Sequence, residues 1–140
     1  MISKVDACTL VTAADASSAT GMAFTNLAAG PQIPGACFYG TSDGTATVLV
    51  FAQAYADSST ADAISPEQLA SAMNGAYGIA NAKAVSGIGD KAVEYSATAS
   101  SGNGIVIFVF KSNVVFMIAL TPSTDSKVIE KLATTAVSRL

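Results

Sequence analysis

The chain has 140 residues, of which 51% are hydrophobic and only 12% are charged, and it contains no histidine. This length fits one ordinary domain, and a net charge of −3 with scattered lysines argues against binding to nucleic acid or anionic lipid. The longest apolar stretch, residues 105–120, is interrupted by a Lys-Ser-Asn hairpin signal, which argues against a membrane span.

The N-terminal part carries both cysteines of the chain, Cys8 and Cys37. We predict that they form one disulfide, which places the protein outside the cytoplasm. A helical turn is expected over residues 5–10. Thr12 and Asp15 form a capping-box pattern that starts a helix over residues 13–20, and Gly21 ends it. A strand is expected over residues 22–27, a loop over 28–35 and another strand over 36–39.

The middle of the chain alternates turn, strand and helix signals. Ser42-Asp43-Gly44 predicts a tight turn, followed by a strand over residues 45–55 and a polar loop over 57–62. Ser65-Pro66 is typical of a helix start, and that helix is expected to run to Tyr77 and to end at Gly78.

The C-terminal part is dominated by strand patterns. Strands are expected over residues 81–85, 91–98, 105–110 and 114–120, with a turn at 87–90 and a hairpin loop at 100–104. Pro122 ends the last strand, and a final helix is expected from Ser123 or Asp125 to Leu140. We predict one α+β domain over residues 1–140, in the order α-β-β-β-α-β-β-β-α, with an antiparallel sheet of about five to six strands packed on helices.

The missing histidines exclude Ser-His-acid and Cys-His catalysis and Cys/His zinc sites, and a bonded cysteine pair leaves no thiol nucleophile. A Ser86–Lys91 pair is supported only by proximity. Residues 87–90 lack the further motifs of nucleotide-binding loops, so we predict no cofactor and no metal.

Glu94 is the acid that merits attention, because it lies in a predicted strand beside Tyr95. We expect one of these two side chains to face away from the core. Asp90 shares the strand face of Glu94 at roughly 13 Å, which favours a solvated edge over an acid–base pair.

Several aromatic residues are candidates for an apolar ligand site, with ordinary core packing as the alternative. The candidate ligand-binding residues are Tyr39, Phe51, Tyr55, Tyr77 and Tyr95.

Three short motifs occur in order along the chain. They are Asp6-Ala7-Cys8-Thr9-Leu10, Cys37-Phe38-Tyr39 and Val85-Ser86-Gly87-Ile88-Gly89-Asp90-Lys91-Ala92. This order resembles a broad group of small bacterial secreted proteins and lipoproteins, best known in actinobacteria, and is similar in style to extracellular sensor domains of mycobacterial kinases. The resemblance implies a cell-envelope location, a Cys8–Cys37 bond and no known reaction. The lipid-carrying cysteine of the lipoprotein members is missing.

These observations favour a non-enzymatic, extracytoplasmic binding module for a small apolar ligand or a partner protein. We expect any leader to have been removed ahead of Met1. The alternative is a self-associating structural or surface subunit in which the strands over residues 105–110 and 114–120 present a sheet edge. A hydrolase that depends on carboxylates or on Ser-Lys is the least favoured hypothesis.

Overall fold

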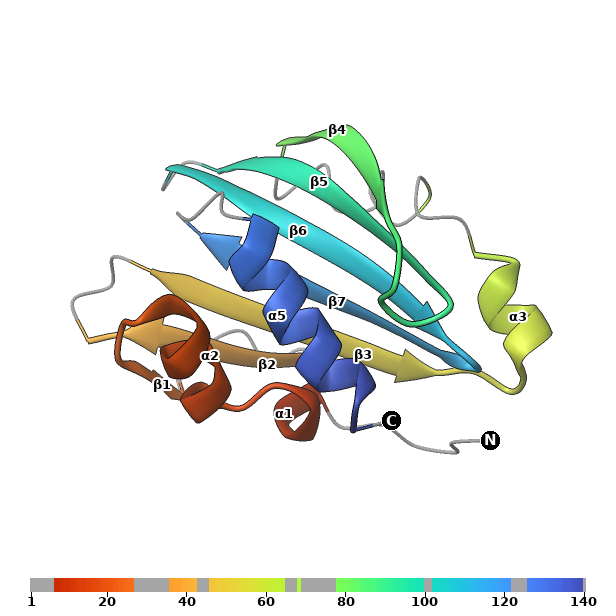
Figure 1. The fold of residues 1–140 in the computed structure, drawn as a ribbon, viewed down its shortest axis with the longest axis horizontal. Helices are drawn as coiled ribbons and strands as arrows, with labels where there is room; N and C mark the ends of the chain where they lie inside the picture. Colours follow the sequence, from red (N-terminus) through yellow and green to blue (C-terminus); the bar gives the residue numbers. More distant parts are fainter. Residues whose placement is uncertain are drawn as a thin grey trace.

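The computed structural model describes residues 7–26, 36–42, 46–64, 68, 78–99, 102–121 and 126–139. A single antiparallel sheet of seven strands is packed against helices, which confirms the predicted α+β class with a larger sheet than expected (Figure 1). The strands are β1 (Phe24–Asn26), β2 (Ala36–Thr41), β3 (Thr47–Ala54), β4 (Gly78–Val85), β5 (Lys91–Ala99), β6 (Gly102–Lys111) and β7 (Val114–Thr121). The helices are α1 (Ala7–Leu10), α2 (Ala13–Thr20), α3 (Ser58–Asp62) and α5 (Ser126–Val137).

The sheet joins two antiparallel meanders side by side, in the order β1-β2-β3-β7-β6-β5-β4. The join is made by β3 and β7, in a register that sets Val50 opposite Ile118. The C-terminal meander has four strands, one on each of the four segments predicted as strands, whereas the predicted order counted only three. The prediction that the strands over 105–110 and 114–120 present a sheet edge is wrong, because β6 and β7 are central and the edge strands are β1 and β4.

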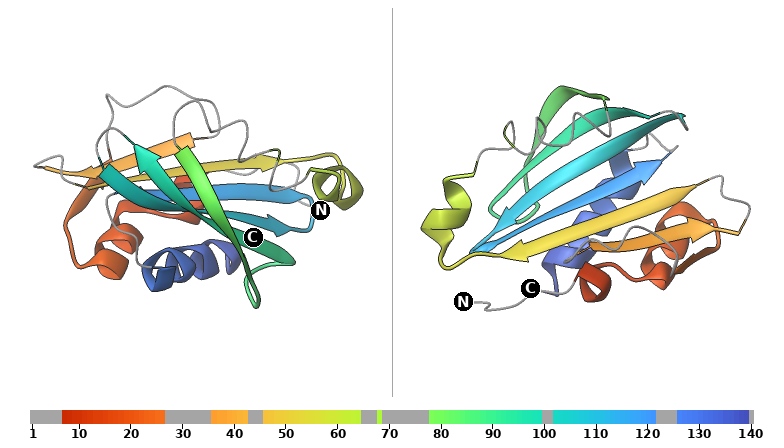
Figure 2. Two further views of the ribbon diagram at one scale, coloured as in Figure 1. Left: turned by 90° about the horizontal axis from the view of Figure 1, so that it is seen from above. Right: turned by 180° about the vertical axis from the view of Figure 1, so that it is seen from behind.

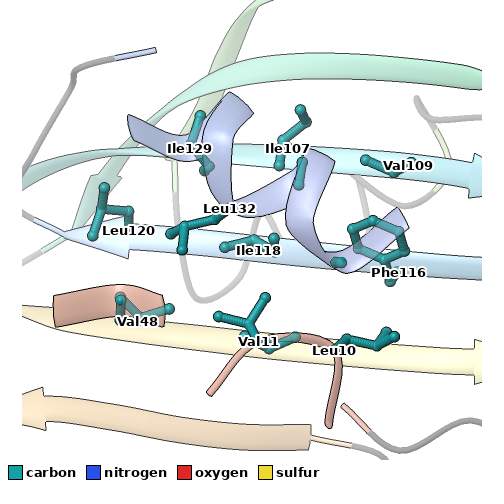
Figure 3. Close-up of a cluster of buried hydrophobic side chains, with 14 of the residues drawn as sticks. Leu10, Val11, Val48, Ile107, Val109, Phe116, Ile118, Leu120, Ile129 and Leu132 are labelled. Carbon is teal, nitrogen blue, oxygen red and sulfur yellow. The ribbon is translucent and has the colours of Figure 1, made fainter. Parts of the chain in front are cut away.

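One face of the sheet, here called the helix face, carries α1, α2 and α5, which Figure 2 shows together on one side. Alternate residues of β3, β6 and β7 point toward these helices. Figure 3 shows part of this core and labels Leu10, Val11, Val48, Ile107, Val109, Phe116, Ile118, Leu120, Ile129 and Leu132.

The opposite face, here called the far face, has its own apolar cluster. Its buried members are Ala61, Tyr95, Val106, Phe108, Phe110, Val115, Met117 and Ala119. Both faces are therefore buried along the central strands, and all eight residues of β7 are buried. This explains why β6 and β7 have nearly continuous apolar sequences rather than a strict polar–apolar alternation.

The local signals around α2 are confirmed. The Thr12 N–H donates to Oδ2 of Asp15 at 2.9 Å and the Asp15 N–H donates to Oγ1 of Thr12 at 3.3 Å, which is the predicted capping box. Gly21 adopts a φ of 76°, and its N–H donates to the Ser17 carbonyl. This is the left-handed C-cap that a glycine accommodates most easily.

Two segments predicted as loops are regular structure. Residues 57–62 contain α3, because Oδ1 of Asp57 accepts the Thr60 N–H at 2.7 Å and so caps a short helix. Residues 102–104 of the loop predicted over 100–104 belong to β6, which begins at Gly102. A Cβ on Gly104 would lie 2.5 Å from the Leu120 carbonyl oxygen, so this glycine allows close strand approach.

Several predictions fall on residues outside the described ranges. They are the loop over 28–35, most of the turn at 42–44 and the predicted helix over 65–77, of which only Gln68 is described, as helical. Gly78, expected to end that helix, is the first residue of β4.

Candidate functional site

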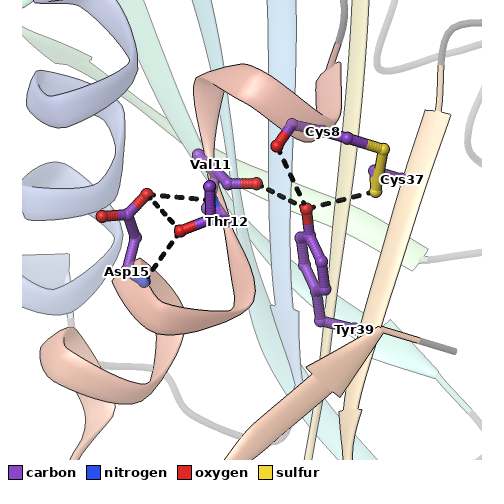
Figure 4. The surroundings of a disulfide bond; sticks show 6 residues. All are labelled: Cys8, Val11, Thr12, Asp15, Cys37 and Tyr39. Carbon is purple, nitrogen blue, oxygen red and sulfur yellow. Dashed lines mark hydrogen bonds between the residues drawn. A yellow bond between two sulfur atoms is a disulfide. The ribbon is translucent and has the colours of Figure 1, made fainter.

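A disulfide joins the first helix to the second strand. Cys8 of α1 and Cys37 of β2 are bonded, as predicted, with Cα atoms 5.3 Å apart (Figure 4). Cys37 is buried in the helix-face core beside Leu10 and Val11 of the N-terminal segment. The bond therefore fixes α1 to the sheet.

Tyr39, a candidate ligand-binding residue, lies beside this disulfide and is only 2% exposed. Its hydroxyl donates to the Val11 carbonyl oxygen at 2.7 Å, and its oxygen lies 3.1 Å from Sγ of Cys37. Val11 links α1 to α2, so the hydroxyl ties both helices to β2. The structure thus places Tyr39 on the helix face as an anchor, apart from the other described candidates.

Arg139, which the sequence did not single out, completes the same region. Its guanidinium forms a bidentate ion pair with Asp15, with Nη2 at 3.1 Å from Oδ1, and Nη1 donates to the Leu10 carbonyl at 2.8 Å. The hydrogen bond from Arg139, together with the capping bonds from Thr12, lowers the pKa of Asp15 to about 2. We call Cys8, Cys37, Tyr39, Asp15 and Arg139 the disulfide corner.

Three of the five candidate ligand-binding residues share the far face. Phe51 of β3 and Tyr55 are half-buried there, and Tyr95 of β5 is buried. Tyr95 packs edge-on against Phe108, with ring centroids 5.7 Å apart. The half-buried Leu49, Ile64 and Val93 complete the cluster. Tyr77 lies outside the described residues.

Tyr55 lies where the far face is half-buried, directly after β3, and its backbone bonds to Asn113 of the β6–β7 turn. The Tyr55 N–H donates to the Asn113 carbonyl at 2.8 Å, and Nδ2 of Asn113 donates to the Tyr55 carbonyl at 2.8 Å. Burial raises the pKa of the Tyr55 phenol. These two hydrogen bonds fix the Tyr55 backbone at the point where β3 leads into α3. The Tyr55 hydroxyl makes an exposed contact of 3.5 Å with Oε1 of Gln53.

The glycine-rich segment at 87–90 is a turn, as predicted, and it supports the β6–β7 hairpin. Gly87 and Gly89 both have positive φ, at 85° and 61°. Oδ2 of Asp90 accepts the Ser112 N–H at 2.7 Å, and Oδ1 lies 3.6 Å from Nζ of Lys111. Asp90 therefore stabilises the turn of the β6–β7 hairpin.

Glu94 contradicts the expectation that either it or Tyr95 faces away from the core. Tyr95 is buried on the far face, and Glu94 is 3% exposed on the helix face. The expectation was wrong because both faces of β5 are covered. Burial, repulsion and hydrogen bonding from Glu130 of α5 raise the pKa of Glu94 to about 7, opposed by the charge of Lys83. We call Glu94, Glu130 and Lys83 the acid seam.

Lys91 does not bond to Ser86, and its Nζ lies 4.4 Å from the ring centroid of Phe110. Within the described ranges, no three Cys, Asp or Glu side chains are grouped so as to hold a metal ion. The described helices include none with the length and apolar character needed to cross a membrane.

Comparison with known proteins supports the fold alone. The structure is similar to the extracellular domain of PknH from Mycobacterium tuberculosis, with a TM-score of 0.56 and 12% sequence identity over 94% of each chain. No protein-family model matches the chain, and a search of curated proteins finds no significant match. The predicted likeness to mycobacterial extracellular domains is thus supported at the level of fold, and the motif-based resemblance to a secreted family stays a prediction.

Proposed function

We propose that the chain is a non-enzymatic, extracytoplasmic module that binds a small apolar ligand on the far face of its sheet. The observation that carries this proposal is that Phe51 and Tyr55 are half-buried against the apolar cluster that also holds the Tyr95–Phe108 pair. Aromatic side chains that are partly accessible provide a large apolar surface for a ligand.

The location rests on two observations that are independent of the ligand. A disulfide persists in oxidising compartments, and Cys8 and Cys37 form one. The fold is shared with an extracellular domain. Alkylation of thiols in intact cells before lysis would test this. We expect Cys8 and Cys37 to be protected, and labelling of both would contradict the proposed location.

The absence of enzymatic activity is supported by what the candidate residues do. Both cysteines are bonded, Asp90 supports a hairpin and Lys91 contacts an aromatic ring. Four of the groups considered as nucleophiles or bases, the two cysteines, Asp90 and Lys91, therefore have structural roles.

The ligand proposal is tested by thermal shift and native mass spectrometry against a panel of fatty acids, phospholipids and glycans. We expect a long-chain acyl compound to raise the melting temperature and to remain bound in the gas phase. Phe51→Ala with Tyr55→Ala is expected to abolish the shift. The matched control is Val128→Ala, which shortens a half-buried apolar side chain on the helix face.

Three results would count against this version of the function. No binding across the panel would leave a partner protein as the occupant of the far face. Equal binding by the double variant and by wild type would place the site elsewhere. Turnover of any panel member would contradict the non-enzymatic proposal.

Self-association through a sheet edge is the second candidate function. Because β6 and β7 are central, it would involve an edge strand, β1 or β4. β4 carries Lys83 and a register shift between Ala80 and Lys83, and both features disfavour pairing with another sheet edge. We therefore expect a monomer in sedimentation at high concentration, and a stable dimer would revive the candidate.

A further inference from the structure

Glu94 is a buried acid that neither the disulfide corner nor the far face explains. It lies in the middle of β5 on the helix face, and its Oε1 is buried without a hydrogen-bond partner among the described residues. Burial of an ionised carboxylate without full hydrogen bonding is strongly unfavourable. The neutral acid is therefore the form that this position accommodates best.

The neighbours of Glu94 come from three elements. Lys83 lies directly opposite on the edge strand β4, and Ile107 lies opposite on β6. Glu130 faces it from α5, where the adjacent Ile129 is fully buried in the core. Lys83 is exposed, and so are Lys127 and Lys131, the lysines that flank Glu130 on its own helix.

These neighbours oppose ionisation of Glu94 more than they favour it. Ile107 provides no polar contact, and a negative charge on Glu130 repels a second one on Glu94. Two close carboxyl groups in a poorly hydrated site are most stable when they share one proton. The exposed ammonium of Lys83 offsets only part of this cost, because water screens it.

We propose that the Glu94–Glu130 pair is a proton-operated latch, which stabilises the packing of α5 on the sheet while the pair carries a proton and loosens the helix when that proton is lost. The protonation state of the pair follows the pH of the surrounding solvent. The latch therefore does not depend on the ligand proposed for the far face.

The direction of the pH dependence follows from the two states of Glu94. The unfolded carboxyl ionises near its ordinary pKa of 4.5, whereas the folded one keeps its proton up to about 7. Below pH 4.5 both states are protonated and the stabilisation is complete. It declines as the pH rises from 4.5 through 7, and above 7 it is lost.

The first test follows amide hydrogen exchange of α5 between pH 5 and pH 8, corrected for intrinsic exchange rates. We expect the opening equilibrium of α5 to increase at least about tenfold over this range, since each unit of pKa difference is a factor of ten. In Glu94→Gln this increase should disappear. In Glu130→Gln it should be smaller than in wild type, because burial of Glu94 remains.

Asp62→Asn is the matched control, because it also replaces a carboxyl by an amide, at an exposed site on α3. It should keep the wild-type pH dependence of α5. Unchanged pH dependence in Glu94→Gln would overturn the latch, and so would its loss in Asp62→Asn.

A second measurement keeps the proposal testable even if a variant fails to fold. Carbon-13 NMR of the Glu94 side-chain carboxyl in the wild-type protein should show a midpoint well above 4.5. A midpoint at or below 4.5 would show that the folded protein does not favour the protonated form, and the latch would be excluded.

Discussion

The disulfide corner and the acid seam hold helices against the same face of one sheet by opposite means. In the corner, a disulfide joins α1 to β2 covalently. The Tyr39 hydroxyl and the Arg139 guanidinium donate hydrogen bonds to backbone carbonyls of the segment that contains α1 and leads into α2. In the seam, Glu130 of α5 interacts with Glu94, a buried acid of β5 that has an unsatisfied oxygen. One sheet face therefore combines a region of fixed attachment with a region whose attachment depends on protonation.

The two regions also respond to acid in opposite directions. Asp15 has a lowered pKa, so its ion pair stabilises the fold above pH 3.8 and is lost as the pH falls through about 2. Glu94 has a raised pKa, so its contribution is lost as the pH rises through about 7. Between pH 4 and pH 5 both regions are near their most stable state.

The largest effect is expected from removal of the disulfide. The double variant Cys8→Ser with Cys37→Ser should lower the free energy of unfolding by about 3.5 kcal/mol, because the unfolded chain regains the freedom of a 29-residue loop. Chemical denaturation measures this loss. Wild-type protein with a reducing agent is the control and should show the same loss of stability. An unchanged denaturation midpoint in both samples would contradict the stabilising role of the disulfide.

Loss of the Tyr39 hydroxyl should cost less. Tyr39→Phe removes the bond to the Val11 carbonyl, and we expect the free energy of unfolding to fall by about 1–1.5 kcal/mol. Tyr55→Phe is the matched control, because the Tyr55 hydroxyl is exposed and its contact with Gln53 is 3.5 Å long. Equal losses in both variants would contradict the anchoring role of Tyr39.

The ion pair of the corner is worth about 1 kcal/mol at neutral pH, after allowance for solvent screening. Asp15→Asn keeps a capping side chain and removes the charge, so it should lose about this amount at pH 7. The difference from wild type should close as the pH falls from 3.8 through about 2. A difference that persists at pH 2 would assign the loss to packing instead.

A change remote from both regions gives the smallest effect. Ser112 adopts a φ of 53° in the β6–β7 turn, which glycine tolerates more easily. Ser112→Gly should raise the free energy of unfolding by about 0.5 kcal/mol at every pH. Ser42→Gly, at a site without positive φ, should give no gain, and a pH-dependent effect of Ser112→Gly would link the turn to the seam.

Local sequence signals predicted the local structure well. The cysteine pair, the Thr12–Asp15 capping box and the strands around the Lys111-Ser112-Asn113 turn depend on residues close in sequence or on a single possible partner. The pairing of β3 with β7 depends on which elements meet, and nothing local encodes it. The burial of Glu94 was missed for the same reason, because it depends on where Glu130 of α5 lies relative to the sheet.

The candidate site also combines residues that the sequence predicted with residues whose position depends on distant contacts. Aromatic content pointed to Phe51, Tyr55 and Tyr95, which do share a face. Tyr39 differs from them because strand alternation in β2 turns it toward α1. Arg139 was missed although it is the chain's one arginine, since its partners lie more than a hundred positions away.

The contact between Arg139 and Leu10 spans 129 positions, whereas the disulfide spans 29. Closing a loop of 29 residues costs less chain entropy than closing one of 129. Contacts of such long range also slow folding. The disulfide is thus the contact of the corner that an unfolded chain reaches more easily, and the guanidinium contact additionally requires α5 to be in place.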